Sequence, residues 1–137
     1  MSEQNKQIAR RFASAFAAGD TAVLVEEIVS AEFVDQYPPP GQGSDRQALI
    51  DAVAAFRTGF PDMEITVERQ VAEGDLVARC GMIKGTHNGE MMGMPATGKG
   101  ATFAWMDMYR IQDGEMVEAW HVEDIAGMLQ QLGLTPS

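Results

Sequence analysis

The chain has 137 residues, enough for one domain with a buried core, and we expect a single domain over residues 1–137. Its net charge of −10 argues against partners that are nucleic acids or anionic membrane surfaces. The lone cysteine, Cys80, excludes an internal disulfide and a cysteine-based zinc site, and the lack of a signal-like or membrane-spanning stretch predicts a cytoplasmic protein.

The first half of the chain reads as helices. Apolar residues recur every four positions at Ile8, Phe12 and Phe16, which predicts a helix that ends at Gly19. A second helix follows Asp20, and residues 31–37 form a short strand. Three prolines and two glycines in residues 38–43 exclude a helix there. The capping-box pattern that begins at Ser44 predicts a third helix, which runs until Pro61.

The second half changes to the two-residue period of half-buried strands. Strands are expected over residues 63–71, 76–87, 101–111 and 115–123, with a glycine-rich loop over residues 88–100. Asp113-Gly114 is a strong hairpin signal, and Asp124 precedes a short last helix. Helices first and hairpin-connected strands later predict an α+β fold with a mostly antiparallel sheet.

Alternation in the last strand suggests which side chains face an interior pocket. Met116, Glu118, Trp120, Val122 and Asp124 share one side and include the bulkier apolar residues, so we place that side inward. His121 then faces outward, unless a bulge reverses part of the strand. A carboxylate in an apolar pocket has a raised pKa, which suits an acid or base at neutral pH. Asp124 could equally be only a helix cap, and Glu118 only an ion-pair partner.

Other chemistry-bearing residues give weaker signals. His87, at the end of a strand, could shuttle a proton or simply bond a loop carbonyl. Arg79 could pair with a pocket carboxylate or with a substrate anion. The two histidines lack metal-ligand spacing, so no metal is expected, and no phosphate loop or nucleophile elbow is present.

The ordered motifs resemble the SnoaL-like polyketide cyclases, a family of the nuclear transport factor 2-like superfamily. The resemblance covers essentially the whole chain and is carried by Gly85-Thr86-His87-Asn88-Gly89, Gly93-Met94-Pro95-Ala96-Thr97-Gly98-Lys99, Tyr109-Arg110-Ile111, residues 113–120, Asp124 and residues 129–133. It implies a cone-shaped curved sheet wrapped around N-terminal helices, a deep apolar cavity, a homodimer packed through the sheet, and no cofactor. It also implies that Asp124 is the acid/base of an intramolecular aldol ring closure and that His87 assists.

We therefore expect a cofactor-independent cyclase or isomerase acting on an apolar carbonyl compound. Asp124 and His87 are the expected catalytic residues, and the expected substrate contacts are Glu118, Trp120, Met92, Met94, Trp105, Phe33 and Tyr37. One alternative is a non-catalytic protein that binds a hydrophobic small ligand. Another is a hydratase or epoxide hydrolase on the same fold, in which Arg79 and two acids converge.

Overall fold

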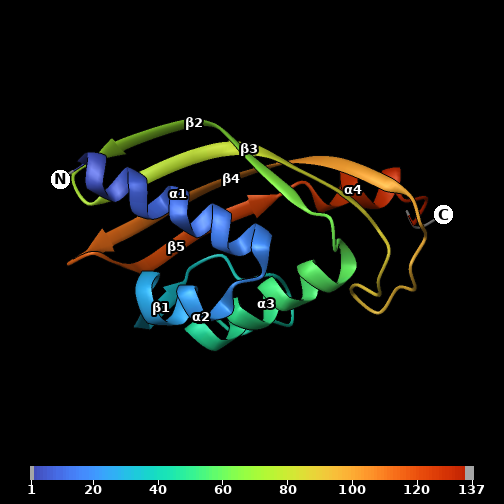
Figure 1. The fold of residues 1–137 in the computed structure, drawn as a ribbon, viewed down its shortest axis with the longest axis horizontal. Helices are drawn as coiled ribbons and strands as arrows, with labels where there is room; N and C mark the ends of the chain where they lie inside the picture. The colour runs from blue at the N-terminus through green and yellow to red at the C-terminus, as the bar shows by residue number, and fades with distance from the viewer. Residues whose placement is uncertain (1, 135–137) are drawn as a thin grey trace.

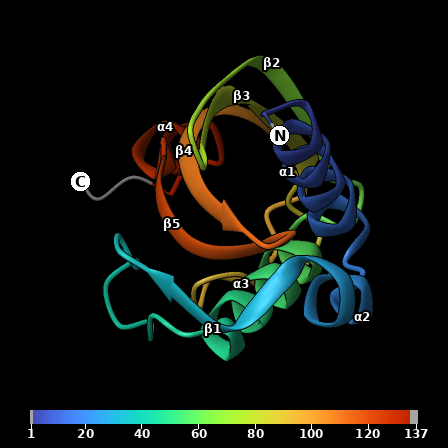
Figure 2. The same ribbon diagram turned by 90° about the vertical axis from the view of Figure 1, so that its left-hand side faces the viewer.

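A five-stranded sheet, curled along its length, forms the framework of the computed structural model, which describes residues 2–134 (Figures 1 and 2). Its elements are α1 (Ser2–Ala18), α2 (Thr21–Val23), the π-helical turn η1 (Leu24–Ile28), β1 (Val29–Asp35), α3 (Arg46–Gly59), β2 (Glu64–Glu73), β3 (Leu76–Thr86), β4 (Gly100–Gln112), β5 (Glu115–Glu123) and α4 (Ile125–Gln131). The expected α+β fold is confirmed: α1 and α3 lie on the concave side of the sheet (Figure 2).

The strand order is β1-β5-β4-β3-β2. The last four strands form an antiparallel meander, and β1 adds to its edge in parallel with β5. The tight turn between β4 and β5 places both Asp113 and Gly114 at positive φ, the backbone conformation that an Asp-Gly hairpin turn requires. The mostly antiparallel sheet expected from the two-residue periodicity is therefore present.

Helix ends follow local capping. Asp45 accepts a hydrogen bond from the Ala48 amide at 2.9 Å, so α3 begins one residue later than the pattern at Ser44 predicts.

α1 buries Ala9, Phe12, Ala13 and Ala15 against the sheet and its neighbours. None of the helices between residues 2 and 134 has the length and apolarity that a bilayer crossing needs.

Two bulges change which residues face inward. On β5, Met116 pairs with Ile111 and Glu118 with Arg110, so Val117 is an extra residue. As a result Met116 and Ala119 are both buried although three positions separate them. A second bulge at Glu68 acts similarly on β2, where Val71 becomes exposed. The inward side expected for the last strand is therefore wrong beyond Val117.

The core has two clusters along the sheet. One surrounds Phe12, Leu24, Ile28 and Met116, and the other contains Phe60, Phe103, Trp105, Met128 and Leu132. Gly81 lies opposite Trp105 in the β3–β4 pairing, and a Cβ there would collide with the Thr66 carbonyl and crowd the indole. Glycine at this position therefore lets the bulged β2 and the Trp105 ring pack closely.

Candidate active site

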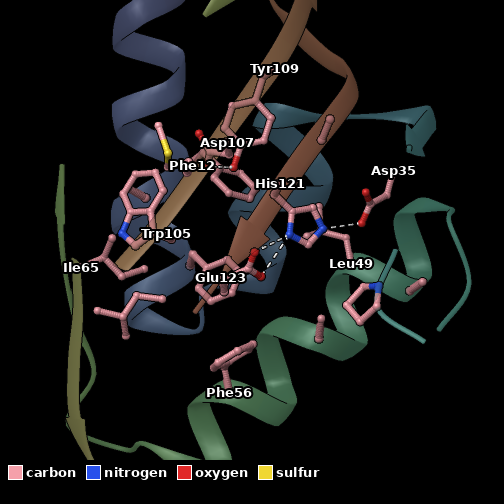
Figure 3. Close-up of a pocket in the computed structure, with 18 of the residues that line it drawn as sticks. Phe12, Asp35, Leu49, Phe56, Ile65, Trp105, Asp107, Tyr109, His121 and Glu123 are labelled. Atoms are coloured by element: carbon pink, nitrogen blue, oxygen red, sulfur yellow. Dashed lines mark hydrogen bonds and ion pairs between the residues drawn. The ribbon is translucent and has the colours of Figure 1, made fainter. Parts of the chain in front are cut away.

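A cavity of about 110 Å³ lies between the concave face of the sheet, α1 and α3 (Figure 3). A single buried water needs only about 10–15 Å³, so a small organic molecule can enter. The wall is mostly apolar and aromatic, formed by Phe12, Phe16, Phe33, Leu49, Phe56, Ile65, Ile83, Trp105 and Tyr109. Pro39, Gln42 and Gly43, which are exposed, form its mouth in the loop after β1. The proline-rich segment thus borders the entrance.

Charged side chains cross the floor of this cavity in a row set by strand register. Arg79 of β3 is paired directly with Asp107 of β4, which is paired with His121 of β5. Directly paired residues project to the same side of a sheet, so all three reach the cavity. Asp35, at the end of β1, completes the row. The bulge at Val117 turns His121 inward, and Glu123 lies two residues further on the same side.

His121 is held between two carboxylates (Figure 3). Its Nε2 lies 2.7 Å from Asp35 Oδ2, and its Nδ1 lies 2.7 Å from Glu123 Oε2 and 3.0 Å from Oε1. The side chains of His121, Asp35 and Glu123 are 23%, 14% and 19% exposed. Burial alone would lower the pKa of His121, but the two carboxylates outweigh it and raise the pKa to about 10. The ring is therefore an imidazolium at neutral pH.

Arg79, Asp107 and Tyr109 form a second, more deeply buried cluster. Arg79 donates to both oxygens of Asp107, at 3.0 and 2.9 Å, and to the Ala9 carbonyl at 2.6 Å. Its guanidinium lies between the Trp105 and Tyr109 rings, 5.0 and 4.9 Å from their centroids. Burial and the charge of Asp107 raise the pKa of Tyr109, whose hydroxyl donates to Asp107 at 2.6 Å. Tyr109 thus remains a neutral phenol.

The hydratase or epoxide hydrolase alternative, in which Arg79 and two acids converge, finds no support in this geometry. Among the side chains that the structure describes, Arg79 bonds one carboxylate, that of Asp107. Nor does the His121 cluster resemble a metal site, because its two ring nitrogens point away from each other toward separate carboxylates. Within residues 2–134, no group of three His, Cys, Asp or Glu side chains is arranged to hold a metal ion. The arrangement is instead suited to moving or holding protons.

Two of the sequence-predicted contacts, Phe33 and Trp105, line the cavity. The expected inward placement of Asp124 is corrected. Asp124 is the N-cap of α4, where its Oδ1 accepts a hydrogen bond from the Gly127 amide at 2.9 Å. A Cβ at position 127 would collide with this carboxylate, so the glycine admits a close cap. The carboxylate is turned to the helix and lies outside the cavity lining.

His87 is likewise outside the cavity. It is fully buried, its Nδ1 lies 3.0 Å from the Thr97 hydroxyl, and its ring packs 5.8 Å from that of Phe60. Its hydrogen bonds therefore join the end of β3 to the loop that precedes β4. The ring thus bonds a loop hydroxyl, whereas the structural alternative drawn from the sequence was a bond to a loop carbonyl.

The remaining expected contacts also lie away from the cavity lining. Glu118 bonds Arg110 at 2.9 Å and Gln36 at 2.7 Å, and Arg110 lies over the Trp120 ring. Tyr37 and Met92 are exposed, and Met94 pairs with Met91 in an isolated bridge. For Glu118 and Trp120 the physical reason is the β5 bulge, which turns both away from the cavity.

Sequence reasoning missed Asp35, Asp107, Glu123 and the inward position of His121. One signal was available, because ionisable residues inside otherwise apolar strands are uncommon unless paired. Asp107 lies between Met106 and Met108, and His121 between Trp120 and Val122. The pairing itself joins residues 86 positions apart and has no local signature.

The chain belongs to the SnoaL-like polyketide cyclase family, whose sequence pattern matches residues 6–132. Among solved structures it is similar to IdmH from Streptomyces antibioticus, a proposed polyketide cyclase, with 35% identity, a TM-score of 0.83, and coverage of 95% of this chain and 99% of that one. A proposed polyketide cyclase from Bacillus cereus shares 28% identity and a TM-score of 0.85, covering 97% and 83% of the two chains.

AclR from Streptomyces galilaeus, a proposed hydroxylase, shares the fold at 24% identity and a TM-score of 0.87, covering 100% of this chain and 85% of that one. No curated protein sequence matches the chain significantly. Because cyclase and hydroxylase assignments occur on one fold, the fold alone does not determine the reaction.

Proposed function

We propose that the protein is a cofactor-independent cyclase or isomerase that acts on an apolar carbonyl compound inside the cavity. The observation that carries this proposal is His121, held as an imidazolium between Asp35 and Glu123 on the wall of an otherwise apolar cavity. The family and the similarity to IdmH support the cyclase class.

Glu123 is the base in this proposal. Its carboxylate lies beside His121 and the aromatic wall (Figure 3), and it takes a proton from the carbon next to the substrate carbonyl. The electron pair of that C–H bond becomes an enolate, which attacks a second carbonyl carbon to close a ring. The new alkoxide then takes the proton back from Glu123, which regenerates the carboxylate, so the net reaction needs no oxidant or reductant.

His121 supplies the donor that the enolate needs. In the resting site its Nδ1–H is given to Glu123 at 2.7 Å. Once Glu123 is protonated, that acceptor weakens, and the N–H becomes available to the developing oxyanion. A donor released only as charge develops stabilises the transition state more than the bound substrate. Asp35 keeps the other nitrogen protonated and the ring in place.

Proton abstraction can be tested without the natural substrate. We would follow exchange of the α-protons of 1-tetralone, a bicyclic ketone, in D2O by NMR. Wild type should accelerate exchange over buffer, and Glu123→Gln should lose about 100-fold or more of that acceleration. Glu115→Gln is the matched control, because Glu115 is exposed on the same strand. Full exchange by folded Glu123→Gln would refute the assignment. Binding of the ketone without exchange would favour the ligand-binding alternative.

We also propose that two copies pair through the convex face of the sheet. Met106 and Val122 are directly paired there and are 59% and 58% exposed, beside the paired Met108 and Trp120. A contiguous apolar patch of this kind is typical of an interface. Sedimentation at micromolar concentration should show a dimer that Met106→Glu shifts toward monomer, whereas Met92→Glu, at an exposed loop methionine, should not. A monomer at every concentration would refute pairing.

A further inference from the structure

Most hydrogen-bond donors on the described side chains that line the cavity already bond other protein groups. Arg79 spends four of its five N–H groups on Asp107, Tyr109 and the Ala9 carbonyl. Both ring N–H groups of His121 donate hydrogen bonds to carboxylates. The indole N–H of Trp105 has no partner among the described residues, but protein atoms enclose it. Among the other described side chains that line the cavity, the donors without a protein partner are the fifth N–H of Arg79, which is buried, and the Gln42 amide at the exposed mouth.

Hydrogen-bond acceptors, in contrast, are in surplus at the His121 end. An ionised carboxylate has about four acceptor positions. Asp35 receives one hydrogen bond from His121 and one from the Tyr37 amide. Among residues 2–134, the one donor to Glu123 is the shared Nδ1–H of His121. Each carboxylate oxygen of the cluster therefore has a partner but retains an unused acceptor position, and the cluster carries one negative charge more than positive.

We infer that the cavity selects an uncharged ring compound with a hydroxyl group that donates a hydrogen bond to Glu123 or Asp35, and that it rejects compounds with a carboxylate at that position. This inference rests on the proposed function insofar as the same cavity is the substrate site.

The physical reason is the balance between lost hydration and new hydrogen bonds. A hydroxyl that reaches the floor exchanges water for a charged acceptor, which makes a strong hydrogen bond. A carboxylate at the same place loses its hydration and faces Asp35 and Glu123 at short range, and both N–H groups of His121, the donor side chain described at this end, are already taken. Arg79 does not relieve this repulsion, because Asp107 already neutralises it.

Three ligands with the same naphthalene ring separate the effect of the donated hydrogen bond from the effect of a negative charge. 2-Naphthol is neutral and donates, 2-methoxynaphthalene cannot donate, and 2-naphthoate is an anion. By calorimetry near pH 7, 2-naphthol should bind at least about tenfold more tightly than either of the others, which corresponds to about 1.4 kcal/mol. Equal affinity for 2-naphthol and its methyl ether, tighter binding of 2-naphthoate, or no binding of any of the three would overturn the inference.

Variants of Glu123 and Asp35 test whether these two carboxylates cause the preference for 2-naphthol. Glu123→Gln removes a charge and adds a donor, so the preference for 2-naphthol over 2-naphthoate should narrow at least about threefold, and Asp35→Asn should act in the same direction. Glu115→Gln makes the same change outside the cavity and should leave the ratio unaltered. An unchanged ratio in both cavity variants would contradict the inference. These are equilibrium measurements, so they can succeed while proton exchange fails, and the two proposals are distinguished.

Discussion

The cavity and the α4 end of the molecule each contain a histidine and a carboxylate, but in opposite surroundings. Glu123 and Asp124 are neighbours in sequence, yet Glu123 faces His121 in the cavity and Asp124 caps α4. His121 lies between two carboxylates, whereas His87 is enclosed beside the Thr97 hydroxyl and the Phe60 ring. The same residue types thus form a charged cluster open to a ligand in one place and a structural contact in the other.

The largest expected effect comes from breaking the buried ion pair of the cavity. Arg79→Ala leaves Asp107 buried without its partner and should lower the free energy of unfolding by about 3–5 kcal/mol in denaturant titrations. Arg10→Ala, at an exposed position on α1, should change it by less than about 0.5 kcal/mol. The double variant Arg79→Met/Asp107→Leu should recover part of the loss, because it removes both charges. A loss below about 1 kcal/mol for Arg79→Ala would contradict this assignment.

The charge of His121 predicts a stability that depends on pH. Its pKa is raised from 6.5 to about 10 in the folded protein, so its stabilising contribution is complete below pH 6.5 and disappears as the pH rises through 10. The difference in unfolding free energy between wild type and His121→Gln should therefore shrink from pH 6 to pH 10. Asp35 and Glu123 contact the ring, Asp107 is its cross-strand neighbour, and Arg79 lies beyond Asp107; all four remain in both proteins. A difference that is constant with pH would mean that the ring is not an imidazolium.

The smallest effect is expected at Asp124. Asp124→Ala removes the cap and should cost about 1 kcal/mol of stability, whereas Asp124→Asn retains a side-chain acceptor and should cost less. Both should keep the ketone exchange rate within about twofold of wild type. The resemblance to SnoaL-like cyclases predicts instead that Asp124→Asn abolishes turnover. Loss of exchange in a folded Asp124→Asn protein would restore that assignment and remove Glu123 from the base role.

Much of the fold could be predicted because its signals are local. The four-residue apolar spacing of α1, the prolines before α3 and the Asp113-Gly114 turn each act within a few residues. The element boundaries consequently agree with the structure to within about two residues, as β1 and α3 show. The residues of the candidate site were predicted less completely. Phe33 and Trp105, expected as substrate contacts, line the cavity, whereas Asp124 and His87, expected as catalytic residues, do not.

By itself the sequence determined the order of helices and strands, the hairpin turns and the family, because these depend on short-range spacing. The tertiary structure decided which side chains meet. A single extra residue at Val117 reverses the face of β5 beyond it, and one of the two carboxylates that bond His121, Asp35, lies on β1, 86 positions away in sequence. Neither the bulge nor the pairing of β1 with β5 produces a periodic pattern in the sequence, because both are stabilised by contacts between distant segments.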